Sequence, residues 1–166
     1  MIDKNAIPTV ADWGDYKADL DTQWTFNRFN QKNFAETAAI FADWIGEPSY
    51  ELSDMPIIPF QYYMTAFSHY VRSAVVQGAF DFENHDDLSY YSFCVHRILT
   101  EKPDFILPLW DEIQSTLDTI TAHAPAWFDD ETVLEEYVEG YPAEALAEFN
   151  AELLKVRDLH HQITTR

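Results

Sequence analysis

The sequence predicts an all-α fold, a single domain of six or seven helices that spans residues 1–166 around one buried aromatic helix. Apolar residues recur every three or four positions along most of the chain, which is the repeat of an amphipathic helix. Three of the four glycines directly follow such a segment, where helices commonly end. The stretch from Pro59 to Gln77 is apolar on nearly every side, as expected for a helix enclosed by others.

The central helix is predicted over residues 59–77. A proline suits its first turn because the missing N–H is no loss there, and Gly78 suits its end. One narrow polar stripe runs along it, formed by Gln61, Thr65, Ser68 and Arg72. The segment is too short and too rich in hydroxyl groups to cross a membrane. We therefore expect it to lie inside a globular core.

Two helices and a connection are predicted before the central helix. The first begins at residues 8–9, and Gly14 inside it costs about 1 kcal/mol relative to alanine. Its apolar face consists of Val10, Trp13, Tyr16, Leu20 and Trp24. The second covers residues 31–45 and ends at Gly46. Residues 47–58 contain Pro48 and Pro56, with Pro59 directly after them, and are predicted to form an irregular connection across the bundle, with a short strand as the alternative.

Four helices are predicted after the central one. The first covers residues 88–100 and precedes Pro103. The next begins near Ile106 and ends at residues 123–125, where Pro125 interrupts the pattern. A short helix follows from residues 129–130 to 139. The last helix begins after Gly140 and directs inward Leu146, Phe149, Leu153, Val156 and Ile163.

The composition is strongly acidic. The formal charge of −19 comes from 29 carboxylates against 10 Lys and Arg, while hydrophobic residues make up 47% of the chain and exclude a disordered acidic tail. A field of this sign opposes binding to nucleic acid or anionic lipid and favours a basic protein partner. Solubility or adaptation to salt is the alternative explanation.

Cysteine chemistry and targeting signals give little indication of function. Cys94 is the only cysteine, so no internal disulfide can form, and its apolar surroundings predict a buried, inert thiol. His96 is two residues away, a spacing that places it on another helix face. No apolar run of signal-peptide length occurs at the N-terminus, and we expect a cytoplasmic protein.

No metal or cofactor site is predicted. The cluster of His85 with acidic residues between 81 and 87 does not fit the calcium-loop template. The adjacent His160 and His161 diverge on a helix and cannot chelate one ion comfortably. Four glycines in all could hardly build a dinucleotide site.

A long stretch whose charged side chains are all Asp or Glu is the most informative feature for function. No Lys or Arg occurs between residues 103 and 154, and Glu144, Glu148 and Glu152 repeat every four residues along one helix face. Such like charges repel by a few tenths of a kcal/mol per pair, roughly. A solvated face of accidental excess is the alternative to a binding surface. The predicted partner-binding residues are Trp127, Asp129, Asp130, Glu131, Glu135, Glu136, Tyr137, Glu139, Glu144 and Glu148, with Phe128 and Tyr141 as further exposed aromatic anchors.

The leading hypothesis is a small, non-enzymatic binding protein. It would be an inhibitor or immunity-type protein that docks its acidic face on a basic partner, such as a toxin nuclease or a nucleic-acid-binding protein, and it would be a monomer or homodimer. The alternative is an enzyme or small-ligand binder with a site between the aromatic helices. That site would use His69, Arg72, His96 or Arg97.

Overall fold

The computed structural model describes residues 3, 5–80, 84–128 and 141–165, and every regular element within these ranges is helical. The predicted all-α fold is therefore confirmed. The α-helices are α1 (Leu20–Phe29), α2 (Phe34–Asp43), α3 (Gly46–Glu51), α4 (Ile57–Val76), α5 (Ser89–Glu101), α6 (Pro103–Ile106), α7 (Trp110–Phe128) and α9 (Tyr141–Thr164). The 3-10 turns are η1 (Val10–Trp13), η2 (Leu52–Asp54), η3 (His85–Leu88) and η4 (Leu107–Leu109).

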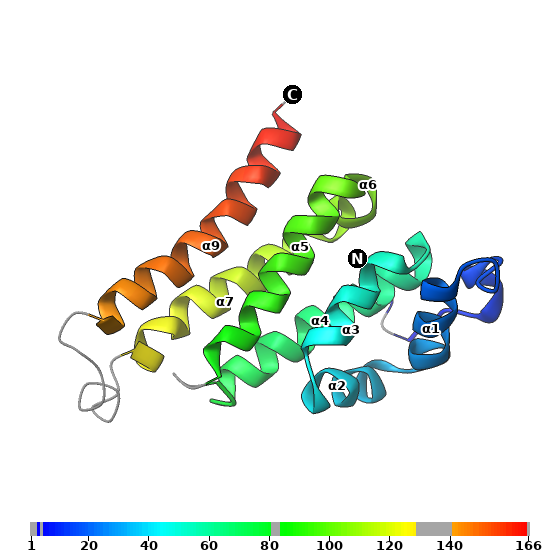
Figure 1. Ribbon diagram of the computed structural model, residues 1–166, viewed down its shortest axis with the longest axis horizontal. Helices are drawn as coiled ribbons and strands as arrows, with labels where there is room; N and C mark the ends of the chain where they lie inside the picture. Colours follow the sequence, from blue (N-terminus) through cyan, green and yellow to red (C-terminus); the bar gives the residue numbers. More distant parts are fainter. Residues whose placement is uncertain (1–2, 4, 81–83, 129–140, 166) are drawn as a thin grey trace.

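The helices form a bundle in which α4 is central. It packs against α2 on one side and against α7 on the other, and η1, η2 and α6 also contact it. Helix α9 then lies along α5 and α7, while α1, α2 and α3 gather at the opposite end of the molecule (Figure 1). The two long helices α7 and α9 therefore bury one side of the core, and the short N-terminal helices bury the other.

Helix α4 is enclosed as its sequence predicts. It begins at Ile57, two residues before the predicted start, and ends just before Gly78, whose φ of 72° lies in the left-handed region that favours glycine. Its fully buried side chains are Phe60, Tyr63, Met64, Phe67 and Val71, with Tyr62 and Val75 almost as buried. Stacking of Phe67 on Phe41 of α2, with ring centroids 4.1 Å apart, extends the aromatic core sideways.

The polar stripe of α4 is directed into the bundle rather than to solvent. The Gln61 amide donates to the Phe105 carbonyl in α6 at 3.2 Å. The Ser68 and Tyr91 hydroxyls share a buried hydrogen bond of 2.8 Å between α4 and α5. Thr65 donates to the Gln61 carbonyl one turn earlier. Because a buried polar group without a partner is costly, these bonds help to fix how α4 is placed against its neighbours.

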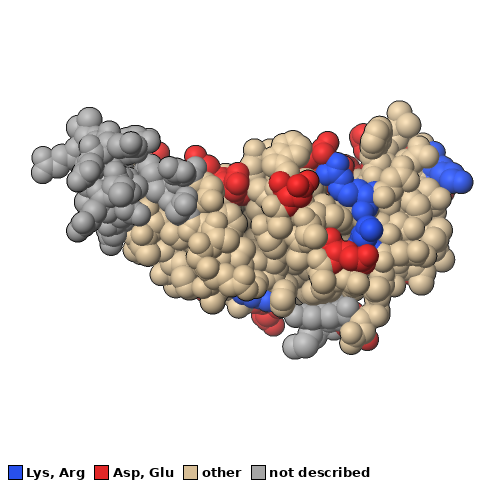
Figure 2. Space-filling model, turned by 90° about the horizontal axis from the view of Figure 1, so that it is seen from below, with Lys and Arg blue, Asp and Glu red and all other residues tan. Residues whose placement is uncertain are grey.

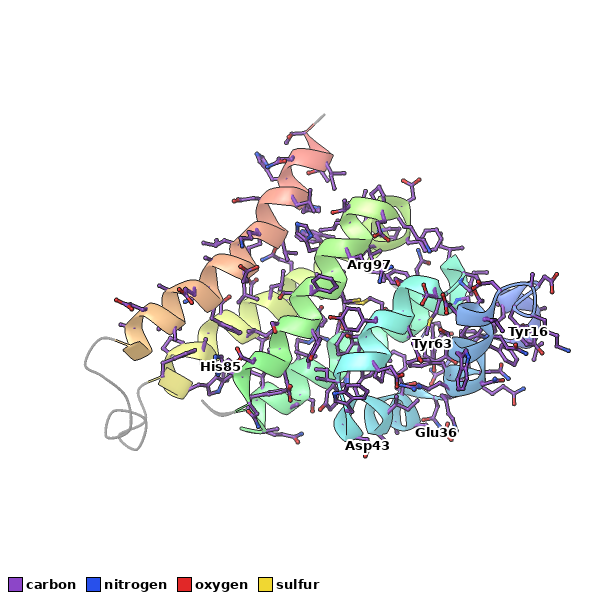
Figure 3. All side chains as sticks on the ribbon, in the orientation of Figure 1. Tyr16, Glu36, Asp43, Tyr63, His85 and Arg97 are labelled. Atoms are coloured by element: carbon purple, nitrogen blue, oxygen red, sulfur yellow. The ribbon has the colours of Figure 1, made fainter. Side chains whose placement is uncertain are left out.

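Tyr63 joins α4 to the N-terminal helices. Its hydroxyl donates to the carbonyl of Phe29, the last residue of α1, at 2.5 Å, and its ring centroid lies 5.2 Å from that of Phe29 (Figure 3). Trp13 approaches the same ring at 6.1 Å. A carbonyl at the end of a helix has no donor within the helix, and the Phe29 carbonyl accepts both from the Lys32 N–H at 3.0 Å and from Tyr63, which fills the core at the same time.

The first predicted helix is wrong as a single element. The structure instead has η1 over residues 10–13 and α1 from Leu20, separated at Gly14, whose φ is 58°. Glycine adopts this conformation at little cost, and Asp19 then caps α1 by accepting from the Thr22 N–H at 2.8 Å. The chain therefore turns where the sequence pattern predicted a continuous helix.

The predicted irregular connection over residues 47–58 is also largely wrong, because it contains α3 and η2. Pro48 is the third residue of α3, where the missing N–H is no loss, and Pro56 precedes the first residue of α4. Gly46 begins α3, and α2 has already ended at Asp43. Prolines here mark the starts of helices, which the sequence alone did not distinguish from a loop.

Helix α7 continues past its predicted end. Pro125 lies inside it, and the helix reaches Phe128. A proline in a helix interior costs about 3 kcal/mol. The three further residues place two large rings in the core, those of Trp127 and Phe128, and burial of each ring contributes about 2 kcal/mol. Tertiary packing therefore overrides the local stop signal.

Helix α9 is held on the bundle by apolar and polar contacts. Its buried residues Phe149, Leu153 and Val156 confirm three of the predicted inward positions. Near its end, His160 stacks on Trp110 with ring centroids 3.6 Å apart, and burial lowers the pKa of His160.

Across the described helices, including α9, none has the length and apolar character that a membrane span needs.

We expect the Ser68–Tyr91 bond to show strong coupling in a double-mutant cycle. Tyr91→Phe and Ser68→Ala should each lower the free energy of unfolding by about 1–3 kcal/mol, because each leaves a buried partner without its bond. The double variant should lose about 1 kcal/mol less than the sum of the two. Urea denaturation measures all three, and strict additivity would contradict this role.

We expect His160 to contribute to acid sensitivity. Its folded pKa is lowered, so the unfolded chain takes up the proton more readily and stability falls as the pH drops below about 6.5. A His160→Phe variant retains a ring against Trp110 and removes this titration. Its melting temperature should fall less than that of the wild type between about pH 7.5 and pH 5. Parallel curves for the two proteins would contradict the assignment.

Candidate functional site

A surface groove follows the junction of α5 with α9. It consists of two adjoining hollows of about 490 Å³ each, and Ser89, Ser92 and Glu152 line both of them. We call it the α5–α9 groove. Its walls come from one face of each helix, and Tyr50 of α3 contributes at one end. His85 and Asp86 of η3 line the other end, so four elements, α3, η3, α5 and α9, form the groove.

Exposed aromatic rings form one end of the α5–α9 groove. Tyr50 and Phe93 are 42% and 50% exposed, and their ring centroids lie 5.4 Å apart in an edge-to-face arrangement. Tyr90 adds a third ring 6.0 Å from Tyr50. Edge-to-face pairs stabilise one another, so the rings are preorganised on the surface. Large apolar side chains exposed together are typical of interaction sites.

Carboxylates form the other part of the α5–α9 groove. Glu148 and Glu152 of α9 line it, and Glu144 is exposed one turn before them on the same helix. Asp86 contributes from η3, directly before α5, and its carboxylate oxygen lies 3.4 Å from Nε2 of His85. The predicted acidic row thus lies next to a groove with exposed rings. That placement is a result of the tertiary structure.

Trp127 and Phe128 were predicted as exposed anchors, and that prediction is wrong. They are only 7% and 3% exposed. Trp127 lies 6.1 Å from Phe149 of α9, and His85 approaches Phe128 at 4.8 Å between α5 and the end of α7 (Figure 3). Because α7 continues through Pro125, its apolar spacing directs both rings inward.

The rest of the predicted partner-binding set lies outside the described residues. It comprises Asp129, Asp130, Glu131, Glu135, Glu136, Tyr137 and Glu139. The side chain of Tyr141 also lies outside them. Of the predicted acidic partner-binding residues, Glu144 and Glu148 on α9 therefore lie in the described part of the chain.

The structure does not gather the four residues of the predicted ligand site. His69 lines a groove between α2 and α4, and His96 lines the α5–α9 groove. Arg97 lies on the α5 face near Glu101, with 3.3 Å between its Nε and a carboxylate oxygen (Figure 3). Arg72 points toward α7. The two described grooves thus each contain one of the histidines.

Arg72 serves as a link between α4 and α7. Its guanidinium pairs with the Glu112 carboxylate and donates to the Glu112 carbonyl at 3.0 Å and to the Thr116 hydroxyl at 2.9 Å. Both charged side chains are mostly buried, so the pair is screened less than a surface pair. The sequence indicated Arg72 as part of a polar stripe, and the structure shows that Arg72 binds Glu112 and Thr116 of α7.

Most of the described Lys and Arg side chains form ion pairs or hydrogen bonds within the protein. Among the described residues, ion pairs with carboxylates are formed by Arg28, Lys32, Arg72, Arg97, Lys155 and Arg157. Lys102 donates to the Ser53 carbonyl at 2.6 Å. On the face of the molecule drawn in Figure 2, most of the visible Lys and Arg side chains lie next to Asp or Glu. The carboxylates beyond these pairs give the surface its sign.

Metal and thiol chemistry find little support in this site. Within the part of the chain that the structure describes, no three His, Cys, Asp or Glu side chains are grouped to hold a metal ion. Cys94 is buried as predicted, and burial raises the pKa of its thiol to about 12. A thiol of this kind stays protonated near neutral pH and is a poor nucleophile.

Comparison of the chain with protein-family models, with characterised proteins and with solved structures finds no match. The site therefore has to be interpreted from its own geometry.

Sequence reasoning missed the aromatic end of the α5–α9 groove. The sequence patterns place Phe93 in the helix predicted over residues 88–100 and Tyr50 in the connection predicted over residues 47–58, and neither residue is indicated as part of a site. The available signal was that Phe93 lies off the stripe of Tyr91, Val95 and Ile98, all three fully buried. A ring outside a well-defined buried stripe is a candidate for exposure, but its neighbour from α3 could not be deduced.

We expect Arg72 to act in stability alone. Arg72→Met should lower the free energy of unfolding by about 1.5–3 kcal/mol, because the Glu112 carboxylate loses its charged partner. Arg97→Met removes only an exposed pair within α5 and should cost about 0.5 kcal/mol or less. Urea denaturation of both variants checks this, and equal losses would contradict the link between α4 and α7.

Proposed function

We propose that the protein is a small, non-enzymatic binding protein whose α5–α9 groove docks on a basic protein partner. One observation carries the proposal: exposed Tyr50 and Phe93 lie at the end of a groove whose other wall holds Glu148 and Glu152. Ring surfaces provide affinity, and carboxylates beside them select for positive charge. An inhibitor or immunity-type role in the cytoplasm is the form of this function we favour.

Charge supports a role in fast and selective association. The chain carries −19 at neutral pH, and most described Lys and Arg are engaged within the fold. A field of one sign steers an oppositely charged partner and raises the association rate. The same field repels nucleic acid and anionic membranes, so a basic protein is the fitting partner class. Toxin nucleases and nucleic-acid-binding proteins carry such surfaces.

The repulsion within the α9 row supports the same interpretation. Glu144, Glu148 and Glu152 are all exposed and follow one another at four-residue spacing, which costs a few tenths of a kcal/mol per pair, roughly. Lys155 pairs with Glu152 at one end of the row only. A bound cationic surface would relieve that repulsion along the whole row.

The α9 carboxylates are tested by a charge-matched comparison. The acidic-row variant carries Glu144→Gln, Glu148→Gln and Glu152→Gln. The control variant carries Asp15→Asn, Asp43→Asn and Asp104→Asn, exposed positions with the same change in net charge, of which Asp43 lies on α2 away from α9 (Figure 3). Each immobilised protein captures basic proteins from host lysate at low salt, and the captured partner is then purified for titration.

We expect the acidic-row variant to bind the partner at least about tenfold more weakly than the control variant. Binding of the wild type should weaken steeply as salt rises from about 50 mM to 500 mM. Phe93→Ala should cost about 2 kcal/mol of binding free energy if its ring is a central contact. Equal binding by the two charge variants, or affinity independent of salt, would contradict the proposal.

A further inference from the structure

A second hollow lies between α2 and the C-terminal half of α4. Its volume is about 650 Å³, within the range of small-molecule sites. We call it the α2–α4 groove. Three alanines of α2, among them Ala38, line it, and their small side chains leave the space open. It shares no lining residue with the α5–α9 groove, so it needs its own interpretation.

Aromatic rings line the α2–α4 groove from three segments. Phe34 comes from the start of α2, Tyr70 from α4 and Phe80 from the segment after α4. These rings are held in place by the core: Tyr70 stacks on Phe41 with centroids 6.1 Å apart, and Phe80 lies 6.4 Å from Trp127. Fixed ring faces around a cavity bind apolar bodies and also attract cations.

The charge at the α2–α4 groove is negative. Asp87 lines it and is exposed, and its charge, after burial, contributes to raising the pKa of Tyr70. None of the described residues that line the groove is Lys or Arg. His69 lines the groove as well, so an anionic ligand would meet the Asp87 carboxylate with one histidine and no Lys or Arg beside it, while a cation would meet Asp87, aromatic rings and the field of the whole chain.

We infer that the α2–α4 groove binds a small organic ammonium ion with an apolar body, such as an arylalkyl amine. The ammonium group would lie near Asp87 and the Tyr70 ring, and the apolar body would lie over Ala38 toward Phe34. Gln77 and Ser73 also line the groove, joined by a hydrogen bond of 3.0 Å from the Gln77 amide to the Ser73 hydroxyl, and the Gln77 carbonyl oxygen is an acceptor of the kind that an ammonium group needs. This site is independent of partner docking at the α5–α9 groove.

Phenethylammonium chloride is the probe, and 2-phenylethanol is its neutral counterpart of similar size. Titration of the full-length protein is followed by calorimetry and by ligand-observed NMR at constant ionic strength. The ammonium should bind saturably at one site, and the alcohol about tenfold more weakly. Equal affinity for the two would overturn the cation assignment, and the absence of saturable ammonium binding would overturn the site.

Two variants locate the bound molecule. Asp87→Asn should weaken ammonium binding about three- to tenfold, whereas Asp104→Asn, an exposed carboxylate on α6 with the same charge change, should leave it unchanged. Ala38→Leu fills the groove without removing a packed side chain and should abolish binding of both probes. Circular dichroism verifies that each variant is folded. Unchanged binding in Asp87→Asn or in Ala38→Leu would overturn the proposal.

Discussion

The burial of α4 along most of its length, with exposure chiefly at its two ends and at His69, is the constraint on which the rest of the structure depends. A helix with apolar residues on nearly all sides must be covered on all sides, and α2, α6 and α7 provide that cover. Its few polar groups then need partners inside the bundle. Ser68 finds Tyr91, and Arg72 finds Glu112 and Thr116. These bonds select one arrangement of the neighbouring helices among those that would bury the same apolar area.

The distribution of surface charge follows from how the few Lys and Arg side chains are paired within the fold. With 10 Lys and Arg against 29 carboxylates, each cation that links elements leaves the surface more negative. Arg28 connects α1 to α3 through Glu47 and Glu51, and Arg157 connects α9 to Asp118 of α7. The acid row on α9 remains largely uncompensated. A negative surface beside the exposed rings of the α5–α9 groove is therefore a consequence of how the fold uses its cations.

Sequence patterns predicted the candidate sites unevenly. The α9 row was predicted because a four-residue repeat is a local property of a helix. Trp127 was predicted to be exposed because Pro125 indicated a helix end. In the structure Trp127 is buried next to Phe80 and Phe149, which lie far from it in the sequence. Tyr50 and Phe93 belong to segments with separate patterns, so no local signal places them together. His69 lines the α2–α4 groove, but the residues predicted to share its site lie elsewhere.

The sequence by itself determined that the chain is helical, which stretch is its core helix, where that helix ends and which carboxylates share the face of α9. These properties depend on residues within a few turns of one another, and helical periodicity encodes them directly. The tertiary structure alone decided that Gly14 separates η1 from α1, that residues 46–54 are helical, and that two grooves form where α9 meets α5 and where α2 meets α4. Those outcomes depend on how faces far apart in the chain pack together, because packing fills the space around α4 with whichever side chains fit and leaves the grooves where they do not.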